Sequence, residues 1–249
     1  MEKIAVVTDT GSNLSFAQAK ELGIYLLPLQ ITIDETTYQD TLEISTQDIY
    51  NELANGKMPK TSMAAYQKIY DLFEELKKDY DTIFAVPLTN GLSTNASTMQ
   101  SIARELEMNV HVIDMYATCA LEKHVAIWIK KLVDEHKSSE EILKIIQPAI
   151  DESNSLILVK NLQHLKRGGR LTPMAAALAG LLKIYPVLHI NKSTEGRIDV
   201  LNKVRTEKRA DAYAIDKIMD DIDIQHTHIY IIHSNFLEGA DHFKKCFIE

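Results

Sequence analysis

The chain of 249 residues carries a formal net charge of -8 at pH 7, and 45% of its residues are hydrophobic and 25% charged, an ordinary globular composition that excludes collagen-like, mucin-like and disordered proteins. This length suits two small domains, each with a buried core. Two cysteines far apart in the chain, Cys119 and Cys246, argue against a disulfide framework and favour the reducing cytoplasm.

Short β-branched runs alternate with longer helical patterns, which is typical of an α/β protein with largely parallel sheets. Strands are predicted at residues 4–8, 25–33, 82–88, 110–114, 156–159, 187–190, 198–204 and 228–233, with a hairpin formed by residues 187–190 and 198–204. Helices are predicted at residues 14–22, 45–54, 94–106, 118–136, 138–150, 162–165, 174–182 and 206–222, with one more that ends near residue 78 and another that begins near residue 236.

Polar residues mark the starts of several predicted helices. Ser45 with Asp48 three residues later resembles a capping box, and Ser138, Thr172 and Thr206 are further N-cap candidates. The polar linker at residues 151–155 is the best boundary, so we expect two α/β domains, residues 1–155 and 156–249, each with a mostly parallel sheet flanked by helices.

The first nine residues form a short apolar run that ends at an aspartate, and they lack the long apolar region and cleavage site of a secretory signal. The longest weakly polar stretch, residues 171–182, is interrupted by Thr172 and Pro173 and is too short to span a bilayer. We therefore expect a cytoplasmic protein without an integral membrane segment.

Charge is unevenly distributed along the sequence. Residues 160–210 hold eleven Lys and Arg against three Asp and Glu, whereas the remainder is strongly acidic. An acidic remainder argues against a nucleic-acid partner, because duplex binding usually needs a broad basic face. The basic segment is either a solvated face or a surface for an acidic protein or a phosphate.

The common nucleotide-binding and phosphatase motifs are missing. The sequence has no G-x-x-x-x-G-K-[ST] and no G-x-G-x-x-G. Asp9 at a strand end resembles an aspartyl nucleophile, but Gly11 stands where such phosphatases place their second aspartate. These classes of enzyme are therefore disfavoured.

A serine-hydrolase elbow is nearly matched by the sequence GLSTN at residues 91–95. Asn95 replaces the final glycine of G-x-S-x-G, which would crowd the strained turn. A triad of Ser93, Asp114 and a histidine would make the chain a serine esterase or thioesterase, whereas the commonest role of a serine here is a helix N-cap. Both interpretations stay open.

Metal and thiol chemistry have weak support. Cys119 and His124 lie five residues apart on one predicted helix, and His226 and His228 alternate on a predicted strand, but neither pair has clustered further ligands. We expect no metal site and no cofactor.

Two pairs of hydroxyl side chains form the remaining candidate site. Thr61 with Ser62, and Ser93 with Thr94, each precede a predicted helix, whose free backbone N–H groups favour an anion. Ser93 also lies where a parallel strand ends, at the edge of the sheet where such folds bind ligands. Hydroxyl groups without a base, an acid or a metal are suited to holding a carboxylate rather than transforming it.

Several stretches together resemble the DegV family of fatty-acid-binding proteins, whose members carry the lipid for a bacterial fatty acid kinase. The strand IAVVTDT at residues 4–10 is similar to the opening I-x-x-D-S of the family, and PKTS at residues 59–62 to its P-x-T-S. The most specific match is LQHLKRGGRLT at residues 162–172, which resembles L-x-Y-L-x-K-G-G-R-I-S. Further matches are PL at residues 28–29, YQD at 38–40, GLSTNA at 91–96, VID at 112–114, YPVL at 185–188, and Arg205 with Lys208.

The resemblance implies that the chain binds a long-chain fatty acid and presents its carboxylate to a fatty acid kinase, and is not itself an enzyme. It assigns the carboxylate to Thr61, Ser62, Ser93 and Thr94. It also places Arg170 and Arg205 on the face that meets the kinase, in agreement with the basic segment. The acyl chain would occupy an apolar tunnel between the two domains, with residues 174–182 as a wall.

The sequence also departs from the family pattern. Thr94 and Asn95 replace the glycine and threonine that follow the serine, and Thr10 and Met115 replace serines that follow aspartates. The C-terminal H-x-G-P-G motif, whose histidine lies near the carboxylate in the family, is absent from this sequence.

Overall fold

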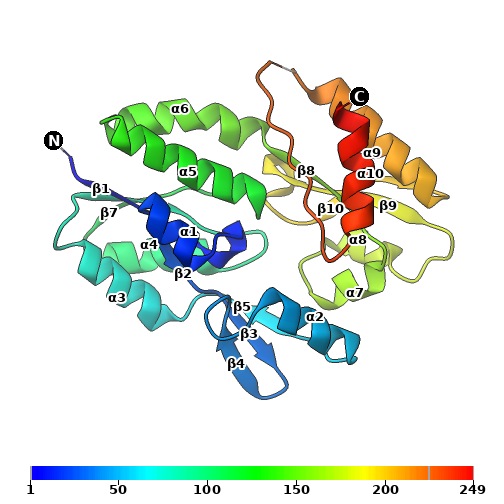
Figure 1. The fold of residues 1–249 in the computed structure, drawn as a ribbon, viewed down its shortest axis with the longest axis horizontal. Helices are drawn as coiled ribbons and strands as arrows, with labels where there is room; N and C mark the ends of the chain where they lie inside the picture. Colours follow the sequence, from blue (N-terminus) through cyan, green and yellow to red (C-terminus); the bar gives the residue numbers. More distant parts are fainter. Residues whose placement is uncertain (1, 224, 249) are drawn as a thin grey trace. The chain divides into compact units, whose positions relative to one another are not determined.

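The computed structural model describes residues 2–223 and 225–248 (Figure 1). The chain divides into two compact units, Met1–Ser153 (unit 1) and Asn154–Glu249 (unit 2), and each is described on its own below.

Unit 1 is built on a parallel sheet of four strands, which confirms the predicted α/β class. Its strand order is β2-β1-β6-β7, and all three neighbouring pairs are parallel. The four strands are β1 (Ile4–Asp9), β2 (Tyr25–Leu27), β6 (Thr82–Val86) and β7 (Asn109–Val112). Because both faces are covered, β1 and β6 are buried throughout and lack polar alternation.

Alternate residues of β1 supply the two cores of this sheet. Ile4 and Val6 pack with side chains of α5 (Ala120–Asp134) and α6 (Ser139–Glu152), while Ala5 and Val7 face the other side. That second side is covered by α3 (Tyr66–Leu76) and α4 (Asn95–Glu105), as the ribbon shows (Figure 1). The period-2 alternation of a strand thus assigns each apolar side chain to one helical layer.

A smaller antiparallel sheet in unit 1 has the order β4-β3-β5. Its strands are β3 (Gln30–Ile33), β4 (Thr36–Gln39) and β5 (Lys60–Ser62). The single strand predicted for residues 25–33 is wrong, since it is divided into β2 and β3 around Pro28. Proline has no N–H to donate to a ladder, so the chain leaves one sheet there and enters the other.

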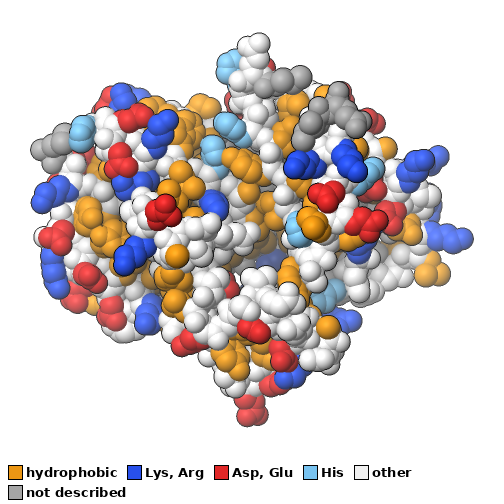
Figure 2. Space-filling model, viewed as in Figure 1, with side chains coloured by type: hydrophobic (Ala, Val, Ile, Leu, Met, Phe, Trp, Pro, Cys, Tyr) orange, Lys and Arg blue, Asp and Glu red, His pale blue; other side chains and the backbone are white. Residues whose placement is uncertain are grey.

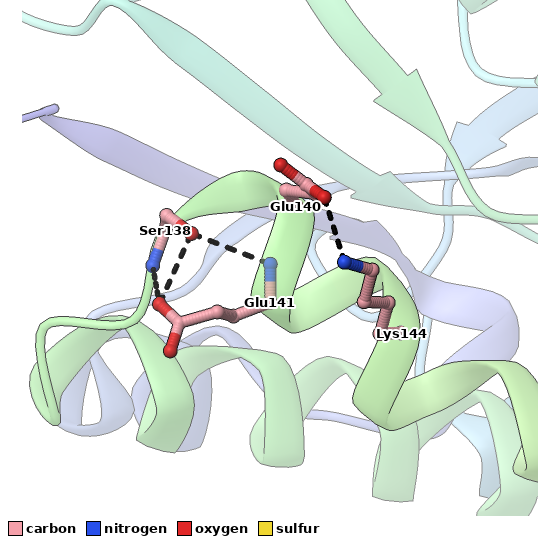
Figure 3. A network of polar contacts seen from close by, with 4 residues as sticks. All are labelled: Ser138, Glu140, Glu141 and Lys144. Carbon is pink, nitrogen blue, oxygen red and sulfur yellow. Dashed lines mark hydrogen bonds and ion pairs between the residues drawn. The ribbon is translucent and has the colours of Figure 1, made fainter.

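Side-chain caps begin the helices where the sequence predicted them. Ser45 and Asp48 form a capping box at α2 (Thr46–Ala54), and Ser138 and Glu141 form one at α6. Figure 3 shows the reciprocal contacts of Ser138 and Glu141. A further capping box starts α1 (Phe16–Leu22), and a 3-10 turn, η1 (Thr10–Ser12), follows β1.

Unit 2 contains a three-stranded sheet of order β10-β9-β8, in which both strand pairs are antiparallel. The strands are β8 (Asn154–Leu158), β9 (Tyr185–Asn191) and β10 (Asp199–Val204). The predicted hairpin is confirmed, but the expected mostly parallel sheet is wrong for this unit. The short 3-10 turn η2 (Lys192–Thr194) joins β9 to β10, and so short a connection can only link antiparallel strands.

The helices of unit 2 are α7 (Leu162–Arg167), α8 (Pro173–Leu178), α9 (Glu207–Asp221) and α10 (Leu237–Ile248). Thr172 and Thr206 cap α8 and α9 as predicted. Helix α8 is shorter than predicted, since Ala179 is extended and Gly180 adopts a φ of 98°. The strand predicted at residues 228–233 is wrong, because this segment joins no ladder and most of its apolar side chains are exposed. Strand propensity alone does not form a strand without a pairing partner.

Across the described residues, no helix combines the length and the apolar character needed to cross a membrane.

Candidate functional site

The loops that follow the strands of the parallel sheet place several polar side chains at one edge. Asp9 ends β1, Ser93 lies between β6 and α4, and Asp114 follows β7 by two residues. The carboxyl ends of parallel strands meet at the same edge of a sheet, which is where open α/β sheets bind ligands. The structure therefore brings these three residues to the expected edge.

Ser93 is half-buried, and its contacts lie within its own loop. Its hydroxyl oxygen accepts a hydrogen bond from Asn95 N at 3.2 Å, and its N–H donates to Thr89 O at 3.0 Å. Thr94 is the N-cap residue of α4, but its side chain makes no capping hydrogen bond. The Ser93 oxygen thus binds a backbone N–H at the start of α4. Its O–H group can still rotate and donate a hydrogen bond to a ligand.

Thr61 and Ser62 are exposed residues of β5 and do not precede a helix directly, which corrects the prediction. Antiparallel pairing places Thr61 opposite Ile31 and Ser62 opposite Gln30. Helix α3 begins only at Tyr66, with Ala65 as an N-cap that has no capping side chain. Strand pairing with β3 extends this segment and so separates the hydroxyl groups from the helix.

The two segments that carry the hydroxyl pairs are nevertheless in contact. Met63, the residue after Ser62, receives hydrogen bonds at its sulfur from Thr94 Oγ1 and Thr98 Oγ1, both at 3.3 Å. A thioether is a weak acceptor, so a carboxylate oxygen would compete well for the Thr94 hydroxyl. One contact therefore joins the end of β5 to the start of α4, and the four predicted side chains belong to neighbouring segments of unit 1.

Asn95 explains why the loop departs from the hydrolase elbow. Its side chain is fully buried and donates from Nδ2 to Asp9 Oδ2 at 2.6 Å. A glycine at this position could not make that bond. Asn95, which replaces the final glycine of the G-x-S-x-G motif, therefore links α4 to the end of β1.

Beneath this link lie two buried carboxyl groups, Asp9 and Glu122, each with 0% exposure. Burial raises the pKa of Asp9, and N–H donors from Leu88, Asn95 and Gly11 offset only part of that rise. Burial, followed by the charge of Asp9, raises the pKa of Glu122 well above its usual value. Since the N–H donors gather on Asp9, the negative charge resides there and Glu122 keeps its proton.

The hydrogen-bonding of Glu122 agrees with a protonated carboxyl. Its Oε1 accepts from Thr8 Oγ1 at 3.2 Å, while no described residue donates to its Oε2. The neighbouring Asp9 carboxyl is a further cause of the raised pKa of Glu122, beside its burial. Sequence reasoning did not single out Glu122, because an acidic residue in the first turn of a helix usually complements the helix dipole at the surface.

Asp114 is used as a loop anchor rather than as part of a triad. Its Oδ2 accepts from Asn90 N at 3.0 Å and its Oδ1 from Tyr116 N at 2.9 Å. Among the described hydrogen bonds, Ser93 has no histidine partner. The geometry of a Ser-His-Asp hydrolase is thus not assembled in the described part of the chain.

Cys119 and His124 do not form a nucleophilic pair. Burial raises the pKa of the Cys119 thiol, which disfavours the reactive thiolate. The His124 ring lies near Trp128, with centroids 6.2 Å apart. Within the described residues, no group of three or more His, Cys, Asp or Glu side chains is arranged to hold a metal ion.

Arg170 and Arg205 are both exposed and lie at opposite ends of β10. Arg170 precedes Leu171, which pairs with Ile198 just before the strand, whereas Arg205 follows its last residue. At roughly 3.3 Å per residue this separates the two positions by about 20 Å. The two arginines therefore cannot grip one small group together, but they can both contact a large partner. On the face drawn in Figure 2, basic and acidic side chains are interspersed.

The fold and the site define an α/β protein in which hydroxyl and buried carboxyl groups meet at the carboxyl edge of a parallel sheet, the usual ligand-binding edge of that class. A family model described as an uncharacterised protein of the DegV family matches residues 3–249. The chain therefore belongs to the DegV family, as its motifs predicted.

Relatives of known sequence and structure agree with this assignment. A DegV domain-containing protein of Caldanaerobacter subterraneus is 32% identical over 240 residues, covering 94% of this chain and 84% of that protein. A fatty acid binding DegV family protein of Streptococcus agalactiae has a TM-score of 0.87 at 28% identity, covering 99% of this chain and 87% of that one. DegV of Bacillus subtilis, described as a fatty acid binding protein, has a TM-score of 0.79 at 28% identity, covering 89% and 78%.

Proposed function

We propose that this protein binds a long-chain fatty acid and holds its carboxylate with Thr61, Ser62, Ser93 and Thr94. The single observation that carries the proposal is the contact of Met63 with Thr94, which joins the two segments that bear the hydroxyl pairs. Hydroxyl donors paired with a carboxylate form charge-assisted hydrogen bonds, which are the stronger kind. Family membership and the fatty-acid-binding relatives support the identity of the ligand.

Mass spectrometry of the purified protein tests this proposal. We expect a co-purifying fatty acid in the wild type, released under denaturing conditions, and depleted in Thr61→Ala and Ser93→Ala. Loss of one hydrogen bond to a charged group should weaken binding roughly tenfold or more. Ser101→Ala, which removes an exposed hydroxyl further along α4, and Thr37→Ala, in the same small sheet as Thr61, are the matched controls. Equal fatty acid content in all five proteins would contradict the assignment.

We further propose that the bound carboxylate is presented to a fatty acid kinase, which moves the γ-phosphoryl group of ATP to a carboxylate oxygen. Arg170 and Arg205 are the proposed contacts with that kinase, and their spacing along β10 fits a protein surface rather than a small molecule. In a reaction with the kinase and ATP, Arg170→Ala and Arg205→Ala should retain bound fatty acid but form acyl phosphate more slowly. Arg104→Ala, an exposed arginine of unit 1, should react as the wild type does.

The serine esterase alternative has no specific support in the geometry. Asp114 already binds two backbone N–H groups, and the described contacts of Ser93 are with its own loop. A fluorophosphonate probe should leave Ser93 unmodified. A covalent adduct on Ser93 would favour the enzyme instead.

A further inference from the structure

Two consecutive residues at the end of β1 are polar and yet buried. Asp9 is 0% exposed and Thr10 is 3% exposed. Burying polar groups costs free energy unless their hydrogen bonds are satisfied, so the partners of these side chains indicate what they stabilise.

Asp9 holds both ends of the loop that carries Ser93. Its Oδ2 accepts from Leu88 N at 2.9 Å, where the loop begins, and from Asn95 Nδ2 at 2.6 Å, where the loop ends. Its Oδ1 accepts from Gly11 N at 2.8 Å. A single carboxylate oxygen therefore fixes the entry and the exit of the Ser93 loop.

Thr10 holds the segment that leads to the other hydroxyl pair. Its Oγ1 accepts from Leu29 N at 3.1 Å. Burial raises the pKa of the Asp40 carboxyl, and the Thr10 side chain acts in the opposite direction. Asp40 N in turn donates to Leu29 O at 2.9 Å. Leu29 directly precedes β3, the strand that pairs with Thr61 and Ser62 in β5. Thr10 thus fixes the position of the small sheet on the end of β1.

The space behind Asp9 leaves little freedom for its carboxylate. A Cβ atom at Gly11 would lie 2.7 Å from Asp9 Oδ1 and 3.2 Å from Glu122 Oε2. Glycine at this position lets the backbone approach both carboxyl groups, and Glu122 of α5 lies close to the same point as Asp9 Oδ1. The orientation of Asp9 is therefore determined by three elements rather than by its own rotamer.

We infer that Asp9 and Thr10 are positioning residues that set the distance between the Ser93 loop and the Thr61–Ser62 strand. This inference rests on the proposed function, since that distance decides whether both hydroxyl pairs reach one carboxylate. Neither residue touches the ligand in this account. The last residue of β1 and the first residue of η1 therefore act on two segments that are far apart in sequence.

The test compares substitutions that remove each bond with substitutions that retain it. Thr10→Val removes the hydroxyl, whereas Thr10→Ser keeps it. Asp9→Asn places an amide against the N–H groups that Asp9 accepts from, whereas Glu122→Gln keeps a donor toward Asp9. Thr82→Val is the control, because Thr82 is a buried hydroxyl at the opposite end of the same sheet, bonded to Glu2 and Asn109.

The measurements are the dissociation constant for oleic acid, the melting temperature and amide hydrogen exchange. Thr10→Val should weaken oleic acid binding about tenfold and speed exchange at Leu29 and in β5, with wild-type affinity restored in Thr10→Ser. Asp9→Asn should weaken binding at least as much and speed exchange at Leu88. Thr82→Val should lower the melting temperature while leaving the affinity unchanged.

Each outcome distinguishes the inference from the proposed function. If the wild type does not bind oleic acid, the proposed function fails and the inference fails with it. If the wild type binds and Ser93→Ala weakens binding, but Thr10→Val and Asp9→Asn bind as tightly as the wild type, only the positioning role is overturned. If Asp9→Asn does not fold, the Thr10→Val and Thr10→Ser pair decides alone.

Discussion

Unit 1 and unit 2 differ in how their sheets are covered. The parallel sheet of unit 1 has a buried core on each face, one against α5 and α6 and one against α3 and α4. Unit 2 buries few apolar side chains, and among the described residues all the exposed large hydrophobic side chains except Leu42 and Tyr66 lie in unit 2. A rigid two-sided core supports a polar site at its edge, because buried carboxyl groups need fixed partners.

The largest expected loss of stability comes from a substitution in the core of unit 1. Phe84 is fully buried in β6, and Phe84→Ala should lower the free energy of unfolding by about 3–5 kcal/mol. Trp128 is the only tryptophan and packs against the same core, so its fluorescence reports this unit. Urea unfolding followed by Trp128 should show the loss. A change below about 1 kcal/mol would mean that this core is far more plastic than its packing suggests.

The matching substitution in unit 2 is Leu188→Ala in the central strand β9. Leu188 is fully buried, and we expect a loss of about 2–3 kcal/mol, since a thinly covered site collapses more easily around a cavity. Hydrogen exchange of β9 and β10 should accelerate while the Trp128 transition stays in place. A shift of the Trp128 transition equal to that of Phe84→Ala would show that the two units do not differ in this way.

A third substitution tests how tightly the polar site depends on unit 1. Gly11→Ala introduces a Cβ atom at 2.7 Å from Asp9 Oδ1, so the carboxylate must shift. Overpacking of this kind costs about 1–3 kcal/mol. We expect a lower melting temperature together with weaker oleic acid binding. If Gly11→Ala is destabilised but binds oleic acid with unchanged affinity, binding does not depend on the position of the Asp9 and Glu122 carboxyl groups.

Helix caps offer a smaller comparison between the units. Ser138→Ala removes a reciprocal capping box at α6, whereas Thr206→Ala removes a single side-chain bond at α9. Each should cost about 1 kcal/mol, with the larger loss at Ser138, because its hydroxyl both accepts from Glu141 N and donates to the Glu141 carboxylate. Thermal unfolding of the two variants measures the difference. A larger loss for Thr206→Ala would contradict the expected order.

The mildest substitution is Glu122→Gln, which has nearly the same shape, and its effect depends on pH. The raised pKa of Glu122 means that the folded protein holds a proton that the unfolded chain releases above its ordinary pKa of 4.5. Wild-type stability should therefore fall, relative to Glu122→Gln, as pH rises from about 4.5 toward the pKa of the folded state. Urea unfolding at pH 5 and pH 8 checks this sign. Stability of the wild type that rises relative to Glu122→Gln over this range would show that Glu122 is ionised in the folded protein.

Local patterns predicted much of this fold. The strands of the parallel sheet, the capped helices at Ser45, Ser138 and Thr206, and the hairpin of β9 and β10 follow from β-branched runs, capping residues and turn composition. Local patterns did not predict the antiparallel direction of the sheet in unit 2, nor the existence of the small sheet in unit 1. Both depend on pairing between segments that are distant in sequence. The segment at residues 228–233 has strand composition but no ladder, because propensity does not supply a partner.

The site was predictable in its parts but not in its connections. The hydroxyl pairs were found from their positions near strand ends and helix starts. The contact of Met63 with Thr94 and the carboxyl pair of Asp9 and Glu122 were not found, because they join residues 31 and 113 positions apart. Only the packing of α5 on β1 shows that a first-turn glutamate points into the core instead of toward water.

The central claim is that hydroxyl groups of unit 1 hold a fatty acid carboxylate. The most direct measurement is the NMR spectrum of oleic acid labelled with ¹³C at its carboxyl carbon, bound to the wild type, Thr61→Ala, Ser93→Ala and the control Ser101→Ala. We predict a bound resonance, distinct from that of free oleic acid, that is unchanged in Ser101→Ala and shifted in both Thr61→Ala and Ser93→Ala. A bound resonance identical in all four proteins would place the carboxylate elsewhere and contradict the claim.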